Sequence, residues 1–363
     1  MGDVLMTGFP GFLGSALLPR ILERREDAAA YCLIQSHYQQ LAGERVAQIE
    51  AAHPHTAGRI SLVAGDITAP GLGIDFVERT TLDGVTEVWH LAAVYDLAVP
   101  EAVAQRVNVE GTAHVIEFCQ SRESFDRLQY VSTCYVSGDY DGEFPEDELD
   151  LGQGFLNHYE STKFEAEVLV RRAMKADLPA TIYRPGIVVG DSQTGETQKY
   201  DGPYFYATYI QRLPRVAIIP GVGDFDVVRA GLVPRDYVID AMDELSVMAK
   251  SRGRTYALTD PNPPTTGEVV DILASYLGRK PIKVKLPLGL TRAVVGRVPG
   301  IEKALGLPAE ALDYLASHTT YSTANAVADL AGTGVTCPPF ASYAEILLDY
   351  WAAHPEHGSS AMT

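Results

Sequence analysis

The sequence predicts an α/β protein in which a doubly wound parallel sheet carries a smaller C-terminal lobe. Short apolar runs alternate with amphipathic stretches through the first half of the chain, as in successive β-α-β units. A glycine-rich turn follows the first apolar run, and Gly/Pro clusters interrupt the alternation from about residue 190. The 363 residues suffice for one large α/β domain with an appended piece, or for two domains of about 150 residues.

The apolar runs predict strands because each is short and bounded by turn residues. The stretches between them predict helices, since their apolar residues recur at helical spacing. The expected strands are 3–6, 31–34, 60–63, 86–91, 127–132 and 180–184, and the clearest helices are 14–26, 38–52, 101–121 and 157–176.

Composition excludes several classes of protein. The formal net charge of −18 argues against a nucleic-acid partner, because binding to phosphates needs a surplus of cations. Cys32, Cys119, Cys134 and Cys337 show no C-x-x-C spacing, so we expect reduced thiols and no metal site. No leader pattern is visible, nor an uncharged apolar run of the ~18 residues that span a bilayer. We therefore expect a cytoplasmic protein.

Residues 7–14 read T-G-x-x-G-x-x-G between the first strand and the first helix. In such a turn the first glycine permits a tight bend, the second lets the backbone approach a pyrophosphate, and the third allows close helix–sheet packing. The helix N-terminus supplies N–H donors to the anion. An ordinary loop is the alternative, but the position in the first β-α-β unit favours a dinucleotide site. Its expected members are Thr7, Gly8, Pro10, Gly11, Phe12, Leu13 and Gly14.

The second strand ends in Ile34-Gln35-Ser36-His37, without the carboxylate that usually holds the adenosine ribose in NAD sites. This favours NADP(H), with NAD(H) as the alternative, and His37 and Arg45 are the nearest basic side chains. Residues after the third and fourth strands predict an adenine pocket, although an aspartate there can equally cap a loop. The pocket candidates are Asp66, Ile67, Leu91, Ala92 and Ala93.

Tyr159 and Lys163 form Y-x-x-x-K on an expected helix and therefore share one face. An ammonium beside a phenol lowers its pKa from about 10 toward the range of a general acid. At the end of the fifth strand, the hydroxyl of Ser132 or Thr133 can hydrogen-bond a substrate carbonyl oxygen, unless the pair only caps a loop. Asn108 is polar on a helix with apolar neighbours, so we expect it to anchor a water or backbone group near Lys163.

Together these motifs resemble the extended short-chain dehydrogenases/reductases in order and spacing, over about residues 1–190. The resemblance implies hydride transfer from a nicotinamide, with Tyr159 as acid/base, Lys163 on the ribose and the phenol, and Asn108 supporting a proton relay. Counted back from Gly138, the hydroxyl position of the family is Thr133 rather than Ser132. The resemblance also implies cofactor contacts from Pro185, Gly186 and Ile187.

Within that superfamily the chain is similar to the branch of fatty acyl-CoA reductases and the thioester-reductase domains of carboxylic acid reductases. The segments that carry this similarity are 131–133, 157–167, 183–195 and 233–238. It implies reduction of a fatty acyl thioester, on CoA or on a carrier protein, or of a fatty aldehyde. The alternatives are a ketone or hydroxysteroid-type dehydrogenase, a sugar-nucleotide epimerase, and a cofactor-binding regulator without catalysis. Two departures are Gln35, where such NADPH enzymes usually have arginine, and the lack of an attached adenylation or carrier domain.

We therefore expect a Rossmann-type NAD(P)-binding domain over residues 1–190, to which the chain returns around 229–258. Residues 191–228 and 259–354 are expected to form the substrate-binding lobe, and 355–363 a disordered tail.

Two features of the substrate lobe suggest its ligands. Its clustered aromatic residues could line a tunnel for an acyl chain or simply pack the lobe. Residues 279–303 hold seven basic residues and one acidic residue, which suits a CoA phosphate, an acidic acyl-carrier protein, peripheral membrane contact or a solvated surface. A monomer and a homodimer both fit the sequence. The clustered aromatic residues are Tyr200, Tyr204, Phe205, Tyr206 and Tyr209.

Overall fold

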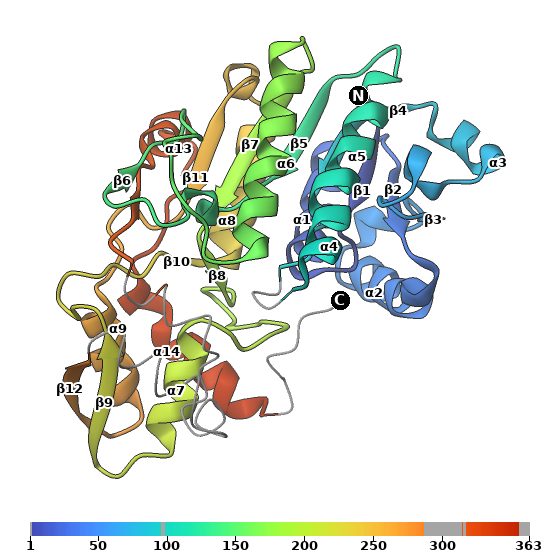
Figure 1. The fold of residues 1–363 in the computed structure, drawn as a ribbon. Helices are drawn as coiled ribbons and strands as arrows, with labels where there is room; N and C mark the ends of the chain where they lie inside the picture. Colours follow the sequence, from blue (N-terminus) through green and yellow to red (C-terminus); the bar gives the residue numbers. More distant parts are fainter. Residues whose placement is uncertain (1, 96–98, 287–313, 315–316, 356–363) are drawn as a thin grey trace.

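The computed structural model describes residues 2–95, 99–286, 314 and 317–355, and it confirms the α/β class (Figure 1). The described residues form a seven-stranded sheet in the order β11-β7-β5-β4-β1-β2-β3. Every neighbouring pair in this sheet is parallel. The strands are β1 (Asp3–Thr7), β2 (Ala30–Ile34), β3 (Ile60–Ala64), β4 (Val85–His90), β5 (Arg127–Val131), β7 (Ala180–Pro185) and β11 (Thr255–Leu258).

Helices cover both faces of this sheet, which makes it doubly wound. One hydrophobic core joins the sheet to α1 (Phe12–Arg24), α2 (Gln39–Ala52), α8 (Arg235–Val247) and α13 (Ala324–Leu330). A second core on the opposite face joins it to α5 (Gly111–Gln120) and α6 (His158–Lys175), which stand in front of the sheet in Figure 1. The short helix α3 (Phe76–Arg79) lies beside β3.

The expected strands all occur, with ends that differ by at most one residue. Two helix predictions need correction. The first helix begins at Phe12 rather than at residue 14, so its first turn lies within the glycine-rich segment. The expected helix 101–121 is three pieces: α4 (Glu101–Ala104), a π-helical turn Gln105–Glu110, and α5. The π-helical turn contains Asn108, and such turns often occur at functional sites.

After residue 229 the chain returns to the sheet, as the strand–helix–strand pattern predicts. β10 (Leu232–Pro234) leads into α8, and β11 then pairs with β7 at the edge of the sheet. β10 itself pairs with β8 (Ile187–Val189), a short strand that follows β7 directly. The loop after β5 contributes β6 (Glu143–Phe144), which pairs with β13 (Thr320–Tyr321).

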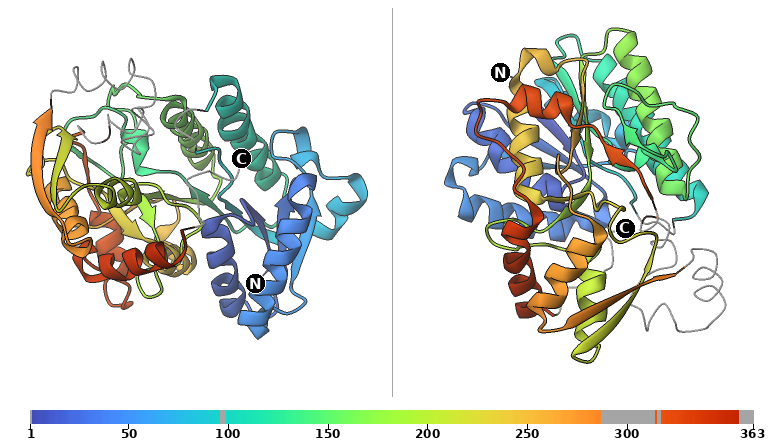
Figure 2. Two further views of the ribbon diagram at one scale, coloured as in Figure 1. Left: turned by 90° about the horizontal axis from the view of Figure 1, so that it is seen from below. Right: turned by 90° about the vertical axis from the view of Figure 1, so that its left-hand side faces the viewer.

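A third hydrophobic core holds the smaller lobe together, at the lower left of Figure 1 and yellow to red in Figure 2. It contains α7 (Pro203–Gln211), α9 (Thr266–Tyr276), α14 (Phe340–Ala353) and β9 (Val216–Val222). β9 pairs in parallel with β12 (Lys280–Leu286), a ribbon that the sequence does not predict. Tyr200, Tyr204 and Tyr206 are buried in this core, so they pack the lobe.

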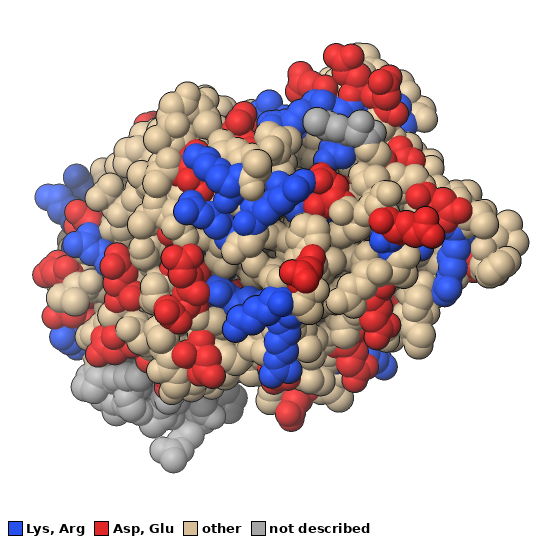
Figure 3. Space-filling view, turned by 90° about the horizontal axis from the view of Figure 1, so that it is seen from above, with Lys and Arg blue, Asp and Glu red and all other residues tan. Residues whose placement is uncertain are grey.

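The surface of the molecule mixes both signs of charge. Seen from above, acidic and basic side chains are interspersed rather than gathered into one field (Figure 3). Exposed pairs such as Arg252–Asp126 join them. Among the described helices none is long and apolar enough to span a membrane. The expected tail 355–363 lies, from residue 356 on, outside the described residues.

Candidate active site

The glycine-rich turn is packed so closely that side chains would not fit. Gly8 has φ of +87°, and a Cβ built on it would lie 2.7 Å from the backbone nitrogen of Ala92. A Cβ on Gly11 would lie 2.7 Å from the carbonyl oxygen of Gly8, and one on Gly14 would lie 3.1 Å from that oxygen. The end of β4 therefore rests directly on the turn, with Leu91 and Ala92 in contact with Gly8.

The N-terminus of α1 is suited to an anion. No side chain caps this helix and its first turn contains no acidic residue. The N–H groups of Phe12, Leu13 and Gly14 belong to that first turn, where backbone donors lack intrahelical partners. Pro10 accepts a hydrogen bond from the Ser15 hydroxyl through its carbonyl (2.9 Å), which ties the turn to the helix. These residues fit the pyrophosphate of a dinucleotide.

One cation near this turn was not predicted from the sequence. The guanidinium of Arg235, at the start of α8, lies 4.9 Å from the centroid of the Phe12 ring. The same group forms ion pairs with Asp191 and Glu196, both at 3.1 Å. The V-P-R-D segment was noted in the sequence, but no spacing rule links it to residues more than two hundred positions earlier.

At the other end of the expected cofactor site, Gln35 and Asp66 are joined. The Gln35 amide donates to one carboxylate oxygen of Asp66 (2.9 Å), and the other oxygen accepts from the Thr68 backbone N–H (2.8 Å). Asp66 therefore caps its own loop, the alternative role considered above. His37 is exposed and its ring centroid lies 4.0 Å from that of Tyr38. Ile67 is buried, and its carbonyl contacts the His114 ring (2.8 Å).

The hydroxyls of Ser132 and Thr133, at the end of β5, have different partners. Ser132 donates to a carboxylate oxygen of Glu167 (2.6 Å), inside the protein. The Thr133 side chain hydrogen-bonds that of Tyr159 and also accepts from the Tyr135 backbone N–H (3.2 Å). The hydroxyl beside Tyr159 is thus that of Thr133.

Tyr159 and Lys163 lie on the first turns of α6, and the described contacts include no hydrogen bond between the phenol and the ammonium. The Nζ atom of Lys163 donates instead to the Val131 carbonyl (2.9 Å) and to the Tyr130 hydroxyl (3.1 Å). Desolvation raises the pKa of Tyr159 to about 12, opposed by its hydrogen bond with Thr133. Desolvation lowers the pKa of Lys163 to about 7, opposed by the charge of Glu167. The sequence argument considered the pair alone, whereas burial disfavours the charged form of both.

Asn108 is buried and anchors backbone, as expected. Its side chain exchanges hydrogen bonds with both backbone groups of Val94 (2.9 and 3.1 Å), and its amide also donates to the Thr162 hydroxyl (3.0 Å). These contacts join the loop after β4 to the catalytic helix one residue before Lys163.

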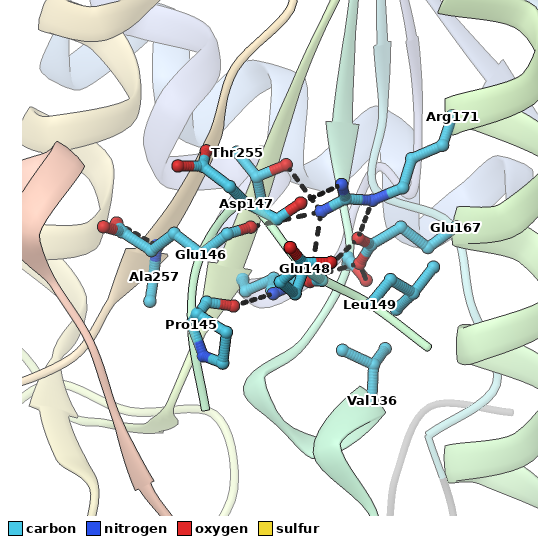
Figure 4. A network of polar contacts seen from close by, with 12 residues as sticks. Val136, Pro145, Glu146, Asp147, Glu148, Leu149, Glu167, Arg171, Thr255 and Ala257 are labelled. Atoms are coloured by element: carbon cyan, nitrogen blue, oxygen red, sulfur yellow. Dashed lines mark hydrogen bonds and ion pairs between the residues drawn. The ribbon is translucent and has the colours of Figure 1, made fainter. Parts of the chain in front are cut away.

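A buried charge network supports the end of β5 from behind (Figure 4). Glu167 accepts from Arg184 (2.6 and 3.1 Å) and from Arg171 (2.8 Å), besides Ser132. The two arginines also bind carbonyl groups of the loop 145–148. Although burial alone would raise it, these partners lower the pKa of Glu167 to about 2. The network fixes α6 against β5, β7 and this loop.

Pro185, Gly186 and Ile187 lie at the carboxyl end of β7 and continue into β8. A Cβ on Gly186 would lie 2.4 Å from the Gly231 carbonyl oxygen, and the Ile187 N–H donates to the same oxygen (2.8 Å). This segment is therefore locked onto the strand pair β8–β10 beside the catalytic end of the sheet. Ala93 follows β4 and is partly buried.

Two contacts at the site come from parts of the chain that sequence reasoning did not connect with it. The Tyr314 ring is tilted by 52° against that of Tyr135 (centroids 4.5 Å apart), and its hydroxyl accepts from Asn157, the N-cap of α6 (2.7 Å). The ammonium of Lys199 lies 4.8 Å from the ring centroid of Tyr95. Neither contact has a local sequence signal, because both pairs are more than one hundred residues apart.

Comparison with known proteins agrees with this geometry. A family model described as male sterility protein matches residues 6–242. The chain is 27% identical over 356 residues to an isonitrile lipopeptide synthase of Streptomyces coeruleorubidus, covering 92% of this chain and 23% of that protein. It is 28% identical over 274 residues to the fatty acyl-CoA reductase wat of Drosophila melanogaster, covering 66% of this chain and 53% of that protein.

Among solved structures, the terminal R domain from the myxalamid PKS-NRPS biosynthetic pathway superposes with a TM-score of 0.82 at 29% identity, covering 98% of this chain and 91% of that chain. A UDP-glucuronic acid 4-epimerase from Bacillus cereus in complex with NAD shares the fold (TM-score 0.67, 19% identity, 99% of each chain). The chain spans only 5% to 53% of the length of the first curated relatives, a linear gramicidin synthase subunit of Brevibacillus parabrevis included.

Proposed function

The chain belongs to the NAD-binding male sterility protein family, within the extended short-chain dehydrogenases/reductases, and we propose that it is an NADPH-dependent reductase of acyl thioesters. The family match and the similar structures support an NAD(P)-dependent reductase of this family. The thioester substrate and the preference for NADPH are the proposal. One observation carries the proposal: Tyr159, on α6, lies beside the Thr133 hydroxyl at the carboxyl end of β5. Lys163 is buried on the same helix.

In the proposed reaction, the hydroxyls of Thr133 and Tyr159 bind the carbonyl oxygen of the thioester. A reduced nicotinamide, when bound, supplies the hydride that adds to the carbonyl carbon. Tyr159 donates its proton to the oxygen that gains charge, and Lys163 stabilises the resulting phenolate. The tetrahedral product then releases the thiol and leaves an aldehyde. A second reduced nicotinamide would supply the hydride for reduction of that aldehyde to an alcohol, with the same side chains binding and protonating its oxygen.

For the cofactor we propose NADP(H), held by residues of the glycine-rich turn at its pyrophosphate. Support comes from the carboxyl end of β2, where Gln35 occupies the position at which NAD sites usually carry a carboxylate. His37 and Arg45 are the candidate cations for a 2′-phosphate. The roles of Asp66, Ile67, Leu91, Ala92 and Ala93 around the adenine, and of Pro185, Gly186 and Ile187 near the nicotinamide, are part of this proposal, as is the division into the two lobes predicted above.

For the substrate we propose an acyl group presented by an acidic carrier domain rather than by CoA. The ribbon β9–β12 supports this choice, because one of its faces exposes four aliphatic side chains. Val216, Ile218, Ile282 and Val284 are 38% to 59% exposed, and Ile218 and Ile282 are partners in the register. Alternate residues Ala217 and Ile219 are fully buried against the lobe, which turns the exposed set toward solvent.

Cations stand at one end of this apolar face. Arg215, Arg279 and Lys280 begin the two strands, and none of them forms an ion pair with a described carboxylate. Lys283 and Lys285, by contrast, pair with Asp271 (2.7 Å) and Asp224 (3.0 Å). In a chain of net charge −18, three available cations beside an apolar face favour an acidic partner with an apolar contact. Arg292 and Lys303 of the basic stretch lie outside the described residues.

One assay tests the catalytic proposal. The purified chain is given NADPH or NADH with an acyl carrier thioester, an acyl-CoA, a fatty aldehyde, a ketosteroid and a UDP-sugar. We expect NADPH oxidation with the thioesters and the aldehyde, and turnover confined to ketosteroids or UDP-sugars would reject the proposal. Tyr159→Phe is expected to lower kcat by at least about 100-fold with little change in cofactor affinity. Tyr140→Phe, in the loop beyond the site, is the matched control and should retain activity.

A second assay tests the docking face. Arg215→Glu and Lys280→Glu should each raise KM for the carrier-bound thioester about tenfold, and leave KM for the free aldehyde unchanged. Arg252→Glu, a charge reversal at another exposed arginine, serves as control. An equal rise in KM for acyl-CoA would assign the cations to the CoA phosphates, and no rise for either substrate would reject the docking face.

A further inference from the structure

Buried polar side chains lie between the glycine-rich turn and Lys163. The Thr7 hydroxyl contacts His90 Nδ1 (2.7 Å), and His90 Nε2 contacts the Thr112 hydroxyl (3.0 Å). The Tyr130 hydroxyl accepts from Lys163 Nζ (3.1 Å). Each of these five side chains is at most 3% exposed. The reaction proposed above uses only Lys163 from this set.

The chemistry of the partners fixes the direction of the bonds between Thr112 and Thr7. Thr112 has one hydroxyl proton, and it donates that proton to the Asn108 carbonyl (2.6 Å). The Thr112 oxygen must therefore accept from His90 Nε2–H. His90 Nδ1 is then unprotonated and accepts from Thr7, whose oxygen accepts from the Ala92 N–H (3.2 Å). Burial, and secondly the charge of Lys163, lowers the pKa of His90 to about 3, in keeping with a neutral ring.

The Tyr130 oxygen serves Lys163 as an acceptor, because an ammonium can only donate. Burial raises the pKa of the phenol well above its ordinary value. The Val131 carbonyl is the second acceptor for Lys163 (2.9 Å). The described residues provide no third hydrogen bond to Nζ, so one of the three ammonium protons remains for the catalytic site.

We propose that Tyr130 is a positioning residue for Lys163: together with the Val131 carbonyl it holds two N–H bonds in place and reserves the third position of Nζ for proton transfer. This inference rests on the role proposed for Lys163 in the reaction. A neutral lysine keeps its two N–H bonds on Val131 and Tyr130, and its lone pair takes the third position. The ammonium can thus give its third proton to the Tyr159 phenolate, and the resulting amine can regain one from solvent through its lone pair, without rotation about the terminal bond.

The groups that face Lys163 are few. Glu167 lies one turn further along α6, and its negative charge favours the ammonium. Tyr159 lies one turn earlier, Tyr130 comes from β5, and neutral His90 comes from β4. The π-helical turn and α5 contribute the uncharged Asn108 and Thr112. Removing the Tyr130 oxygen therefore deletes an acceptor for the ammonium without altering a charge.

The test follows the protonation of Lys163 directly and needs no substrate. The full chain is labelled with ¹³Cε-lysine, its eight lysines are followed by NMR against pH, and the Lys163 signal is identified by its loss in Lys163→Arg. We expect Tyr130→Phe to lower the titration midpoint of Lys163 by about one pH unit, because the charged form loses an acceptor. An unchanged midpoint overturns the proposal.

Tyr183→Phe is the matched control. Tyr183 is fully buried on the neighbouring strand β7, and its hydroxyl donates to Gln129 (2.8 Å). The midpoint of Lys163 should stay the same in this variant, and an equal shift would overturn the proposal by making the effect a general loss of packing. The titration of Lys163 needs no substrate, so a negative result in the thioester assay does not affect it. The two proposals can therefore fail separately.

With a thioester substrate, the pH at which kcat falls should move down with the midpoint in Tyr130→Phe while KM changes less than twofold.

Discussion

Replacement of Glu167 by glutamine is expected to destabilise the protein strongly. The Glu167 side chain is fully buried and carries the charge opposite Arg184 and Arg171 (Figure 4). Glutamine has nearly the same size, but it is neutral and offers an N–H₂ group to partners that are themselves donors. Removing one partner of a buried ion pair costs about 3–5 kcal/mol. The shift of the Glu167 pKa from 4.5 to about 2 corresponds to about 3 kcal/mol by linkage, which agrees with the cost of breaking a buried ion pair.

The sign of the pH dependence follows from the same shift. The pKa of Glu167 is lower in the folded state, so its contribution is complete above pH 4.5 and is lost as pH falls toward about 2. Urea unfolding of both proteins at pH 7 and at pH 3, followed by circular dichroism, measures this contribution. The difference in unfolding free energy between wild type and Glu167→Gln should be largest at pH 7 and should shrink at pH 3.

Asp126→Asn is the control, because the pair Arg252–Asp126 is about half exposed. Exposed pairs are worth about 0.2–1 kcal/mol, so this variant should stay within that range. A loss below about 1 kcal/mol for Glu167→Gln, no larger than the loss expected at an exposed pair, would refute the reasoning about the buried network.

Three further changes test other parts of the molecule. Gly8→Ala should weaken NADPH binding at least tenfold in a fluorescence titration, because the new Cβ meets backbone of Leu91 and Ala92; Gly43→Ala, where nothing lies within 4 Å, should bind normally. Gln35→Arg should raise the NADPH-to-NADH ratio of kcat/KM about tenfold, and an unchanged ratio would contradict a 2′-phosphate at the end of β2. Of the four cysteines, only the partly exposed Cys337 should react with a thiol reagent before unfolding, since Cys32, Cys119 and Cys134 are buried.

The sheet could be predicted from the sequence because its strands are marked locally. Each central strand is a short apolar run, buried on both faces, between a turn and an amphipathic helix. The helix that carries Tyr159 and Lys163 is also marked by local sequence, and its ends were predicted to within one residue. The π-helical turn at Asn108 was missed, because its apolar residues follow the pattern of an ordinary helix. The ribbon β9–β12 was missed as well, since its two strands lie more than fifty residues apart and β12 interleaves lysines with aliphatic residues.

The identity of the site residues followed from spacing, but their partners did not. A strand-end hydroxyl and Y-x-x-x-K can be read from the chain, and the choice between Ser132 and Thr133 rested on resemblance. The structure adds a physical reason, because the Ser132 hydroxyl is bound to the buried Glu167. The expected effect of Lys163 on Tyr159 stays a prediction, and the spacing could not show that burial raises the pKa of Tyr159 and lowers that of Lys163.

The sequence by itself determined the class of fold, the glycine-rich turn and the candidate catalytic groups, because these depend on residues close together in the chain. Only the tertiary structure decided what surrounds them. Lys163 is held by Tyr130 and Val131 from a strand more than thirty residues earlier, and His90 joins Thr112 to the turn at Thr7. Contacts of this kind are set by the order of strands in the sheet, which no local pattern records, and they decide how the charge and the protons of Lys163 are arranged.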